Sequence, residues 1–252
     1  MSESSHDRRE SDRTDGEVLL SVEDLVAGYG LGQVLRGIDF EVGRGEVVSL
    51  IGRNGAGKTT TLESILGNVP EIAGTIQFDG TDVTELSNDE TISQGIAYVP
   101  EERRVFPGLT VRENLEVAQV AAGNDRARDI DTIIGMFENL QENEQSLGSE
   151  MSGGEQQMLA IARALVSGAE LLMLDEPTEG LAPYIVRSVE ETIKELNESG
   201  ITILLVEQNV QVAMEVSDTH YVINQGEVVY EGSSADLEEN QQILDQYLGI
   251  SS

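Results

Sequence analysis

The residues from Gly52 to Thr60, which read GRNGAGKTT, carry the clearest chemistry in the sequence. They match the phosphate-binding pattern G-x-x-x-x-G-K-[ST], in which glycines let backbone N–H groups converge on a phosphate at the start of a helix. Lys58 is expected to reach the β- and γ-phosphates of a nucleotide, and Thr59 to offer its hydroxyl to Mg²⁺. A strand-like run before this glycine loop and a helical pattern after it argue against an accidental turn. The predicted ATP-binding residues are Gly52, Arg53, Asn54, Gly55, Ala56, Gly57, Lys58, Thr59 and Thr60.

A pair of carboxylates, Asp175 and Glu176, follows the apolar run Leu171 to Leu174. Such a run without alternation is typical of a parallel strand covered on both faces, whose carboxyl end borders the ligand crevice. Because adjacent strand residues point to opposite faces, the two side chains are expected to have different roles. Asp175 is predicted to order Mg²⁺, and Glu176 to polarise the water that attacks the γ-phosphate. The alternative is a solvated acidic pair before the turn at Pro177.

The segment Ser152-Gly-Gly-Glu155 has two interpretations. The spacing S-x-x-E is a capping box, which starts a helix and needs no ligand. A helix N-terminus with two glycines and a free hydroxyl can also hold a γ-phosphate. The chain has one glycine loop of the ATP-binding type, so the sequence offers one more phosphate site than one bound ATP requires.

Strands and helices alternate around these motifs. The opening, with strands at 18–26 and 35–42, is antiparallel in character, and later segments follow a β-α-β rhythm. Capping boxes begin at Ser87 and Thr110, and helical composition continues to about Leu140. A helix is expected after Pro183, a hairpin over 221–230, and a final helix up to about Leu248. Further strands are expected at 46–51, 74–80, 96–99, 171–174 and 201–206.

The charge of the chain indicates its surroundings more than its chemistry. Its 252 residues include 47 Asp and Glu against 15 Lys and Arg, which gives a formal net charge of −32, and they include no cysteine. This excess of carboxylate repels nucleic acid and anionic lipid, so contact with a membrane is expected to run through a protein partner. Residues 1–16 lack the apolar core of a signal peptide and are predicted to be a disordered, polar tail. The even spread of acidic residues suggests a proteome adapted to concentrated salt.

The segment MSGGEQQMLAIARAL, closely followed by LLMLDEP, resembles the signature segment of ABC ATPases, and the resemblance covers nearly all of residues 17–248. In that family two nucleotide-binding domains pack head to tail, and each ATP lies between the glycine loop of one domain and the signature of the other. The resemblance therefore implies that the second phosphate site serves a partner's ATP, and that Tyr29 stacks on adenine, with core packing as the alternative. EGLAP, residues 179–183, would cross between the domains. The implied signature residues are Ser152, Gly153, Gly154 and Glu155.

The same resemblance implies a fold and marks two departures. The fold is an α/β ABC ATPase nucleotide-binding domain over residues 17–250, with a RecA-like parallel sheet, an antiparallel β subdomain and a helical insertion at about 101–151. Glu101 stands where the family usually has a glutamine that senses Mg²⁺, and its carboxylate is expected to bind the ion. Gln208 replaces the usual histidine that reaches the γ-phosphate. Glutamine hydrogen-bonds but holds no proton, so slower hydrolysis is expected.

Three further segments make the resemblance more specific: YVPEERRVFPGLTVRENL, EGLAP and LLVEQNV. Together with the signature segment they resemble the LivF type, one of the two ATPases of importers for branched-chain amino acids. This resemblance implies two permease subunits, a second ATPase subunit as dimer partner, an external solute-binding protein, and a peripheral place on the inner face of the cell membrane. ATPases of importers for urea and other amides are similar. Two other classes of protein stay open: a soluble ABC ATPase without a transport role, which usually brings duplicated domains or a basic patch, and a regulatory module without useful hydrolysis.

Overall fold

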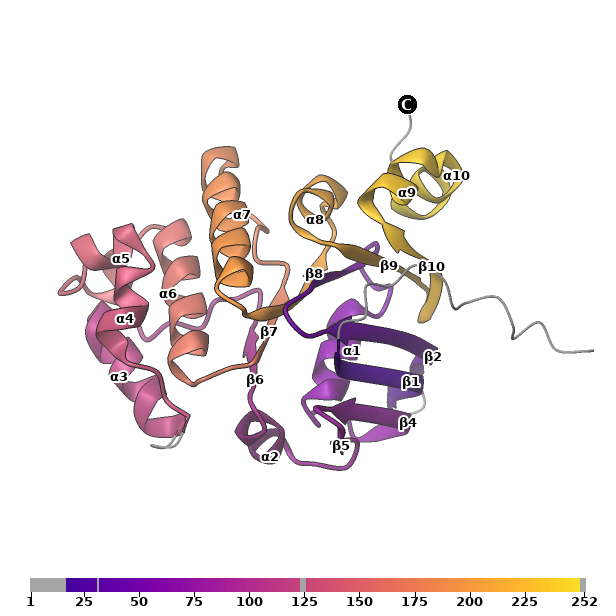
Figure 1. The fold of residues 1–252 in the computed structure, drawn as a ribbon, viewed down its shortest axis with the longest axis horizontal. Helices are drawn as coiled ribbons and strands as arrows, with labels where there is room; N and C mark the ends of the chain where they lie inside the picture. The colour runs from indigo at the N-terminus through magenta and orange to yellow at the C-terminus, as the bar shows by residue number, and fades with distance from the viewer. Residues whose placement is uncertain (1–16, 31, 123–125, 250–252) are drawn as a thin grey trace, which may run out of the picture.

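The computed structural model describes residues 17–30, 32–122 and 126–249, so the predicted tail at 1–16 lies outside the described residues. Two sheets and the helices that cover them make up this part of the chain (Figure 1). The strands are β1 (Val18–Tyr29), β2 (Gly32–Gly43), β3 (Val47–Ile51), β4 (Glu71–Phe78), β5 (Thr81–Asp82), β6 (Ile96–Val99), β7 (Leu171–Asp175), β8 (Thr202–Glu207), β9 (Thr219–Asn224) and β10 (Glu227–Ser233). The helices are α1 (Lys58–Ile65), α2 (Asn88–Ser93), α3 (Val111–Ala122), α4 (Ile130–Gly135), α5 (Glu138–Glu142), α6 (Gly153–Val166), α7 (Pro183–Glu198), α8 (Val210–Val216), α9 (Ser234–Glu239) and α10 (Gln241–Ile243), with a 3-10 turn at Gly148–Glu150.

The central sheet has the strand order β10-β9-β3-β8-β7-β6 and is parallel except for the β9–β10 hairpin. Successive residues of its inner strands enter two different cores. Val48 and Leu204 pack on the side of α1, whereas Val47 and Leu205 pack with α6 and α7. The uninterrupted apolar runs predicted as two-sided strands are therefore confirmed, because each face of the sheet is covered.

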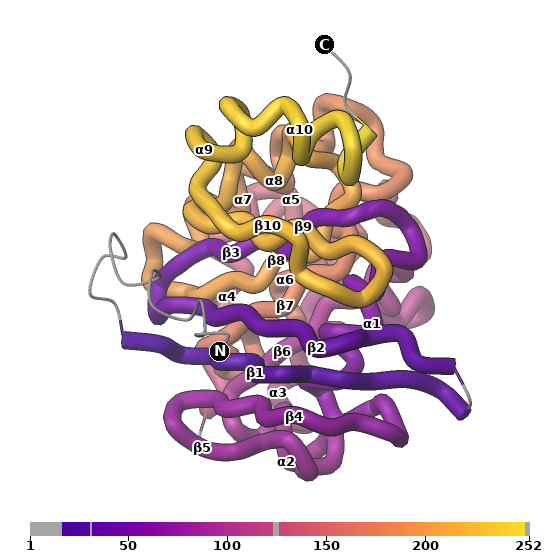
Figure 2. The backbone as a smooth tube through the Cα atoms, turned by 90° about the vertical axis from the view of Figure 1, so that its right-hand side faces the viewer, coloured from indigo at the N-terminus to yellow at the C-terminus, as the bar shows by residue number. Residues whose placement is uncertain are grey.

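The second sheet is antiparallel, with the order β2-β1-β4-β5 (Figure 2). Helix α1 separates it from the central sheet, since Leu62 and Ile65 share one core with Leu25 of β1 and Ile38 of β2. The antiparallel opening predicted from the sequence is confirmed. One consequence is that the helix after the glycine loop is held from both sides by apolar contacts.

Helices α3 to α6 lie beside the central sheet, on the opposite side of the ribbon view from the antiparallel sheet (Figure 1). The capping box expected at Thr110 is present, because a carboxylate oxygen of Glu113 accepts the Thr110 N–H at 2.8 Å. Buried Asn114 accepts the Phe106 N–H at 2.8 Å and donates to the carbonyl oxygens of Phe106, Leu109 and Thr110. This amide therefore fixes the loop that leads from β6 into the helices.

The C-terminal segment differs from expectation. The predicted hairpin is present as β9 and β10, but a single final helix to Leu248 is wrong. The chain leaves helical geometry at Asn240, which has φ −93° and ψ 71°, and its side chain caps the next turn by accepting the Ile243 N–H. A π-helical turn, Leu244–Leu248, follows and ends at Gly249, which has a left-handed φ of 72°. Within the described ranges, none of the helices has the length and apolar composition of a membrane span.

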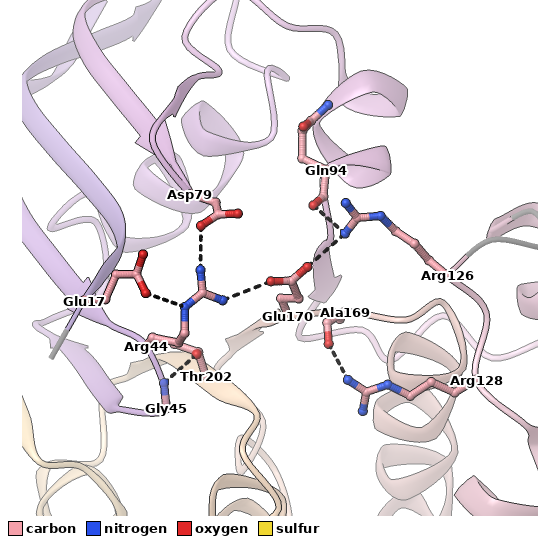
Figure 3. Close-up of polar contacts among 10 residues, drawn as sticks. All are labelled: Glu17, Arg44, Gly45, Asp79, Gln94, Arg126, Arg128, Ala169, Glu170 and Thr202. Atoms are coloured by element: carbon pink, nitrogen blue, oxygen red, sulfur yellow. Dashed lines mark hydrogen bonds and ion pairs between the residues drawn. The ribbon is translucent and has the colours of Figure 1, made fainter.

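A polar cluster around Arg44 and Glu170 joins the antiparallel sheet, the central sheet and the helical segment (Figure 3). The Arg44 guanidinium lies 2.5 Å from a carboxylate oxygen of Asp79 and 3.1 Å from one of Glu170. The other oxygen of Glu170 lies 3.1 Å from Nη1 of Arg126, which also donates to the carbonyl of Gln94. Two of the few cations in this acidic chain thus share one carboxylate where the three parts meet.

Candidate nucleotide-binding and catalytic site

The glycine loop follows β3 and leads into α1, as the sequence predicts. Gly55 and Gly57 have φ of 78° and 116°, values that a residue with a Cβ adopts at a cost. Gly52 is required by space instead, because a Cβ there would lie 2.4 Å from the carbonyl oxygen of Ile223. The turn between β9 and β10 supports the loop from behind, since the Gly226 N–H donates to the Ala56 carbonyl at 2.8 Å. These features suit a backbone cradle for phosphate.

The Lys58 side chain lies within the loop and is only 4% exposed. Its Nζ donates to the carbonyl oxygen of Gly52 at 2.8 Å and lies 3.1 Å from a carboxylate oxygen of Glu176. A buried ammonium needs such partners, because desolvation of an unpaired charge is unfavourable. The cation predicted to meet the phosphates and the carboxylate predicted to act on water are therefore in contact.

Asp175 lies at the end of β7 with only 3% of its surface exposed. One carboxylate oxygen accepts the Thr59 hydroxyl at 3.3 Å, and the other accepts the Tyr98 hydroxyl at 3.0 Å. Burial raises the pKa of Asp175, against the opposing effect of these two hydrogen bonds. Hard oxygen donors of this kind fit Mg²⁺, which keeps several waters and also binds phosphate oxygens. Thr59 and Asp175 thus place oxygen atoms side by side that could hold the ion.

Glu176 corrects one expectation. The sequence predicted that Asp175 and Glu176 point to opposite faces, yet both carboxylates meet residues of the glycine loop. The reason is that β7 ends at Asp175 and that Glu176 has a left-handed φ of 45°, so strand alternation no longer applies to it. Its N–H donates to the Val206 carbonyl at 2.9 Å, which ties this turn to β8.

The Ser152-Gly-Gly-Glu155 segment begins α6 with the predicted capping box. Oε2 of Glu155 accepts the Ser152 N–H at 2.7 Å, and the Ser152 hydroxyl accepts the Glu155 N–H at 3.4 Å. Packing favours glycine at position 154, because a Cβ there would lie 2.5 Å from Ile185. A Cβ on Gly153 would lie 2.9 Å from Nη1 of Arg103, the end of a flexible side chain that can move aside. Capping and packing account for the local structure of this segment.

Comparison with known families agrees with this geometry. A family model described as "ABC transporter" matches residues 35–179, which is more than half of the chain and runs from β2 to just beyond Glu176. The chain belongs to the ABC transporter family. As an ABC ATPase it binds ATP, uses Mg²⁺ and couples ATP hydrolysis to transport.

Individual relatives cover nearly the whole ABC domain. The "High-affinity branched-chain amino acid transport ATP-binding protein BraG" of Pseudomonas aeruginosa is 41% identical over 232 residues, which are 92% of this chain and 100% of that protein. The "Lipopolysaccharide export system ATP-binding protein LptB" of Haemophilus influenzae is 32% identical over 92% of this chain and 97% of its own length. A solved structure of a dimeric ATP-binding cassette with ADP and Pi bound is 25% identical, with a TM-score of 0.74 over 86% of this chain and 99% of that chain.

Three further ABC site residues predicted from the sequence have clear positions. Tyr29 ends β1 and is 50% exposed, so core packing does not explain it, and its ring is open to a ligand. Glu101 follows β6 as an exposed residue and makes no hydrogen bond or ion pair of its side chain within the described part of the chain. Gln208 is exposed in the turn between β8 and α8. The contact of Glu101 with Mg²⁺ remains a prediction, and so does the contact of Gln208 with the γ-phosphate.

Two neighbours of the site were not predicted from the sequence. Tyr98 of β6 donates to Asp175, but an isolated tyrosine in an apolar strand gives no signal in the sequence. Glu207 ends β8, is 2% exposed, and accepts hydrogen bonds from Thr178 and Asn209. Burial raises its pKa to about 7, more than those hydrogen bonds lower it. A carboxylate at the end of an otherwise apolar run was the available signal.

Proposed function

We propose that this chain is an ATP-hydrolysing subunit of an importer for branched-chain amino acids. The supporting observation is its 41% identity to BraG of Pseudomonas aeruginosa over the whole of that protein. Its partners in this proposal are two permease subunits, a second ABC ATPase and, indirectly, an external solute-binding protein. The chain would then sit on the inner face of the membrane through the permeases and would not contact the amino acid.

The proposed roles follow from the contacts around the glycine loop. Residues Gly52 to Thr60 would hold the phosphates, and Thr59 and Asp175 would hold Mg²⁺, which would supply positive charge beside the phosphate oxygens. Lys58 exchanges its contact with Glu176 for the β- and γ-phosphates when ATP binds, which frees the Glu176 carboxylate to orient the attacking water. Glu101 and Gln208 act beside them on the ion and the γ-phosphate. Tyr29 stacks on adenine.

The proposed active unit is a head-to-tail dimer of ABC domains. Ser152, Gly153, Gly154 and Glu155 lie at the start of α6, where N–H groups favour an anion. In the dimer this signature faces the γ-phosphate held by the partner's glycine loop, and residues 179–183 cross the interface. The dimeric cassette with ADP and Pi supports such an assembly. ATP would close the two domains, and hydrolysis with product release would open them.

A second candidate is an ATPase of an export system, because LptB of Haemophilus influenzae is 32% identical over nearly its full length. A urea or amide importer and a soluble ATPase without permeases would also differ in their partners. All of these share the ATP site, so ATP hydrolysis by the isolated chain does not separate them.

The test is to purify the tagged full-length chain from its own cells in high salt and to identify its partners by mass spectrometry. Two permeases with a second ATPase are expected, and reconstituted vesicles should take up leucine, isoleucine or valine only with ATP and the binding protein. Recovery with an export permease, or uptake of urea but no branched-chain amino acid, would overturn the substrate. Recovery with no membrane protein would overturn the transport assignment proposed here.

A further inference from the structure

A buried carboxylate that none of the proposed catalytic roles uses lies next to the site. Glu207 ends β8, is 2% exposed, and forms no ion pair among the described residues. Removing a carboxylate from water is unfavourable unless its oxygens are well supplied with donors. A methylene-rich or amide side chain would fill this position at lower cost, so the retained charge calls for a reason.

The contacts of Glu207 supply that reason. Oε1 accepts the Thr178 hydroxyl at 2.7 Å and the Thr178 N–H at 3.3 Å. Oε2 accepts the Asn209 N–H at 3.3 Å. Thr178 lies two residues beyond Glu176, and Asn209 directly follows Gln208, so one carboxylate joins the two turns that carry the proposed catalytic side chains.

Beyond the ladder of β7 and β8, one backbone hydrogen bond joins these turns among the residues that the structure describes. The Glu176 N–H donates to the Val206 carbonyl and so links the turn after β7 to β8. This bond holds the backbone of Glu176 and does not itself orient the Glu176 carboxylate. Glu176 has a left-handed φ of 45°, a conformation that local contacts must stabilise. Gln208 and Asn209 are exposed, and they connect β8 to an α8 of 7 residues. A hydrogen-bonded carboxylate between the turns fixes both at once.

We propose that Glu207 is a positioning residue for ATP hydrolysis, which holds the Glu176 turn through Thr178 and the Gln208 turn through Asn209. The proposal rests on the proposed roles of Glu176 and Gln208. Glu207 itself does not touch ATP; its carboxylate sets the distance and orientation of the two side chains that do. Misplacement of a catalytic group by about 1 Å lowers a rate by about 10²-fold, so a loosened turn reduces kcat while nucleotide binding at the glycine loop is retained.

The test uses the full-length chain in the complex that copurifies with it. Thr178→Val removes the hydroxyl at nearly constant volume, and Thr178→Ser is the matched control that keeps it. Glu207→Gln is the independent variant, because its amide cannot accept hydrogen bonds from both turns. For Thr178→Val and Glu207→Gln we expect kcat to fall about tenfold or more with KM and the Kd for ATP within about twofold of the parent, and Thr178→Ser to behave as the parent.

Other outcomes overturn the inference. If Thr178→Val and Glu207→Gln lower only the unfolding temperature, with kcat retained, Glu207 has a structural role alone. If KM and Kd rise while kcat stays constant, the carboxylate serves nucleotide binding. Failure of the underlying proposal has a different signature, since a Glu176→Gln protein that still hydrolyses ATP at the parent rate would remove the catalytic assignment whatever Thr178 does. A Glu176→Gln protein that is inactive beside a fully active Thr178→Val protein would overturn the positioning role only.

Discussion

At the scale of single residues, the contact between Lys58 and Glu176 leads to the first prediction. Glu176→Gln keeps the size of the side chain but removes the base and the ion pair with Lys58. ATP binding should persist, because the backbone of the glycine loop is unchanged, and hydrolysis should fall by about 10²- to 10⁴-fold. Filter binding of ATP and release of phosphate measure the two effects separately. Glu239→Gln, on exposed α9, is the control; parent-like turnover in Glu176→Gln would contradict the assignment.

Gln208 leads to a second prediction at this scale. It lies exposed in the turn after β8, at the position where the resemblance to ABC ATPases implies a histidine, and glutamine has no titratable proton. Gln208→His should raise kcat if contact with the γ-phosphate limits the reaction, by about tenfold or less. Gln208→Leu is the matched variant without a hydrogen-bonding group and should lower kcat. Equal rates for histidine, glutamine and leucine at this position would show that the residue has no part in the reaction.

Glu207 makes the stability of the protein depend on pH. Burial raises its pKa from 4.5 to about 7, with the nearby charge of Glu176 acting in the same direction. A raised pKa in the folded state means that this contribution to stability is present below pH 4.5 and is lost as pH rises through about 7. The free energy of unfolding of the parent, relative to Glu207→Gln, should therefore fall by about 3 kcal/mol over that range. Urea unfolding of both proteins at constant salt measures it, and a pH-independent difference would contradict it.

The sequence predicted the site residues to different depths. The glycine loop was predicted from the spacing of its motif, and Asp175 from its place at the end of an apolar strand. Both lie where the sequence predicted. The orientation of Glu176 was not predictable, because it depends on one backbone angle beyond the end of β7. Glu207 lacks any motif, since its contact with Asn209 is local and its contact with Thr178 forms only when β7 and β8 pair in parallel.

At the scale of elements, buried His220 connects three segments. Its ring nitrogens lie 2.6 Å from the Ser49 hydroxyl of β3 and 2.7 Å from the Ser234 hydroxyl of α9. Burial lowers its pKa from 6.5 to about 4, against the opposing effect of Asp218. The unfolded chain therefore takes up a proton first, and this contribution to stability is present above pH 6.5 and is lost as pH falls through about 4.

His220→Gln, which keeps polar atoms at the same position but does not titrate, tests this link. Between pH 6.5 and 4 the parent should lose about 3 kcal/mol relative to the variant, because the unfolded state alone gains the proton in that range. Chemical unfolding followed by circular dichroism at several pH values gives both curves. Parallel curves would show that His220 stays accessible to protons in the folded state.

The elements themselves followed from apolar periodicity and caps wherever a segment had one clear pattern. The strands β3, β7 and β8 were predicted because each is apolar on both faces, and α6 because Ser152 and Glu155 form a capping box. The C-terminal helix was not, because Asn240 breaks it with a backbone conformation that helical composition does not reveal. Composition predicts the type of an element, whereas this interruption depends on the backbone conformation and the local cap of one residue.

At the scale of the whole molecule, the net charge of −32 means that surface carboxylates repel one another in the folded state. Some charge is compensated locally, as where Arg44 and Arg126 share Glu170, but each exposed pair of this kind contributes only about 0–1 kcal/mol. Helix α7 carries exposed Glu191, Glu195 and Glu198 on successive turns, and none of the three forms an ion pair within the described part of the chain. Like charges at such spacings repel.

Salt should therefore decide whether the chain stays folded. The Debye length is about 10 Å at 0.1 M and about 3 Å at 1 M, so concentrated salt removes most of the repulsion between surface carboxylates. We predict that the unfolding temperature rises steadily with KCl and that the chain loses structure and ATPase activity in dilute buffer. Replacing Glu191, Glu195 and Glu198 together by glutamine should reduce this dependence, because three charges leave one face of α7 while the glycine loop and its neighbours are untouched.

Parent and triple variant are compared by thermal unfolding across a salt series, with sucrose at matched osmolality as the control for excluded-volume effects. If the parent is as stable in dilute buffer as in concentrated salt, or if sucrose stabilises it as much as KCl does, charge repulsion does not govern its stability. The hypothesis that the chain is adapted to a salt-rich cell would then be wrong.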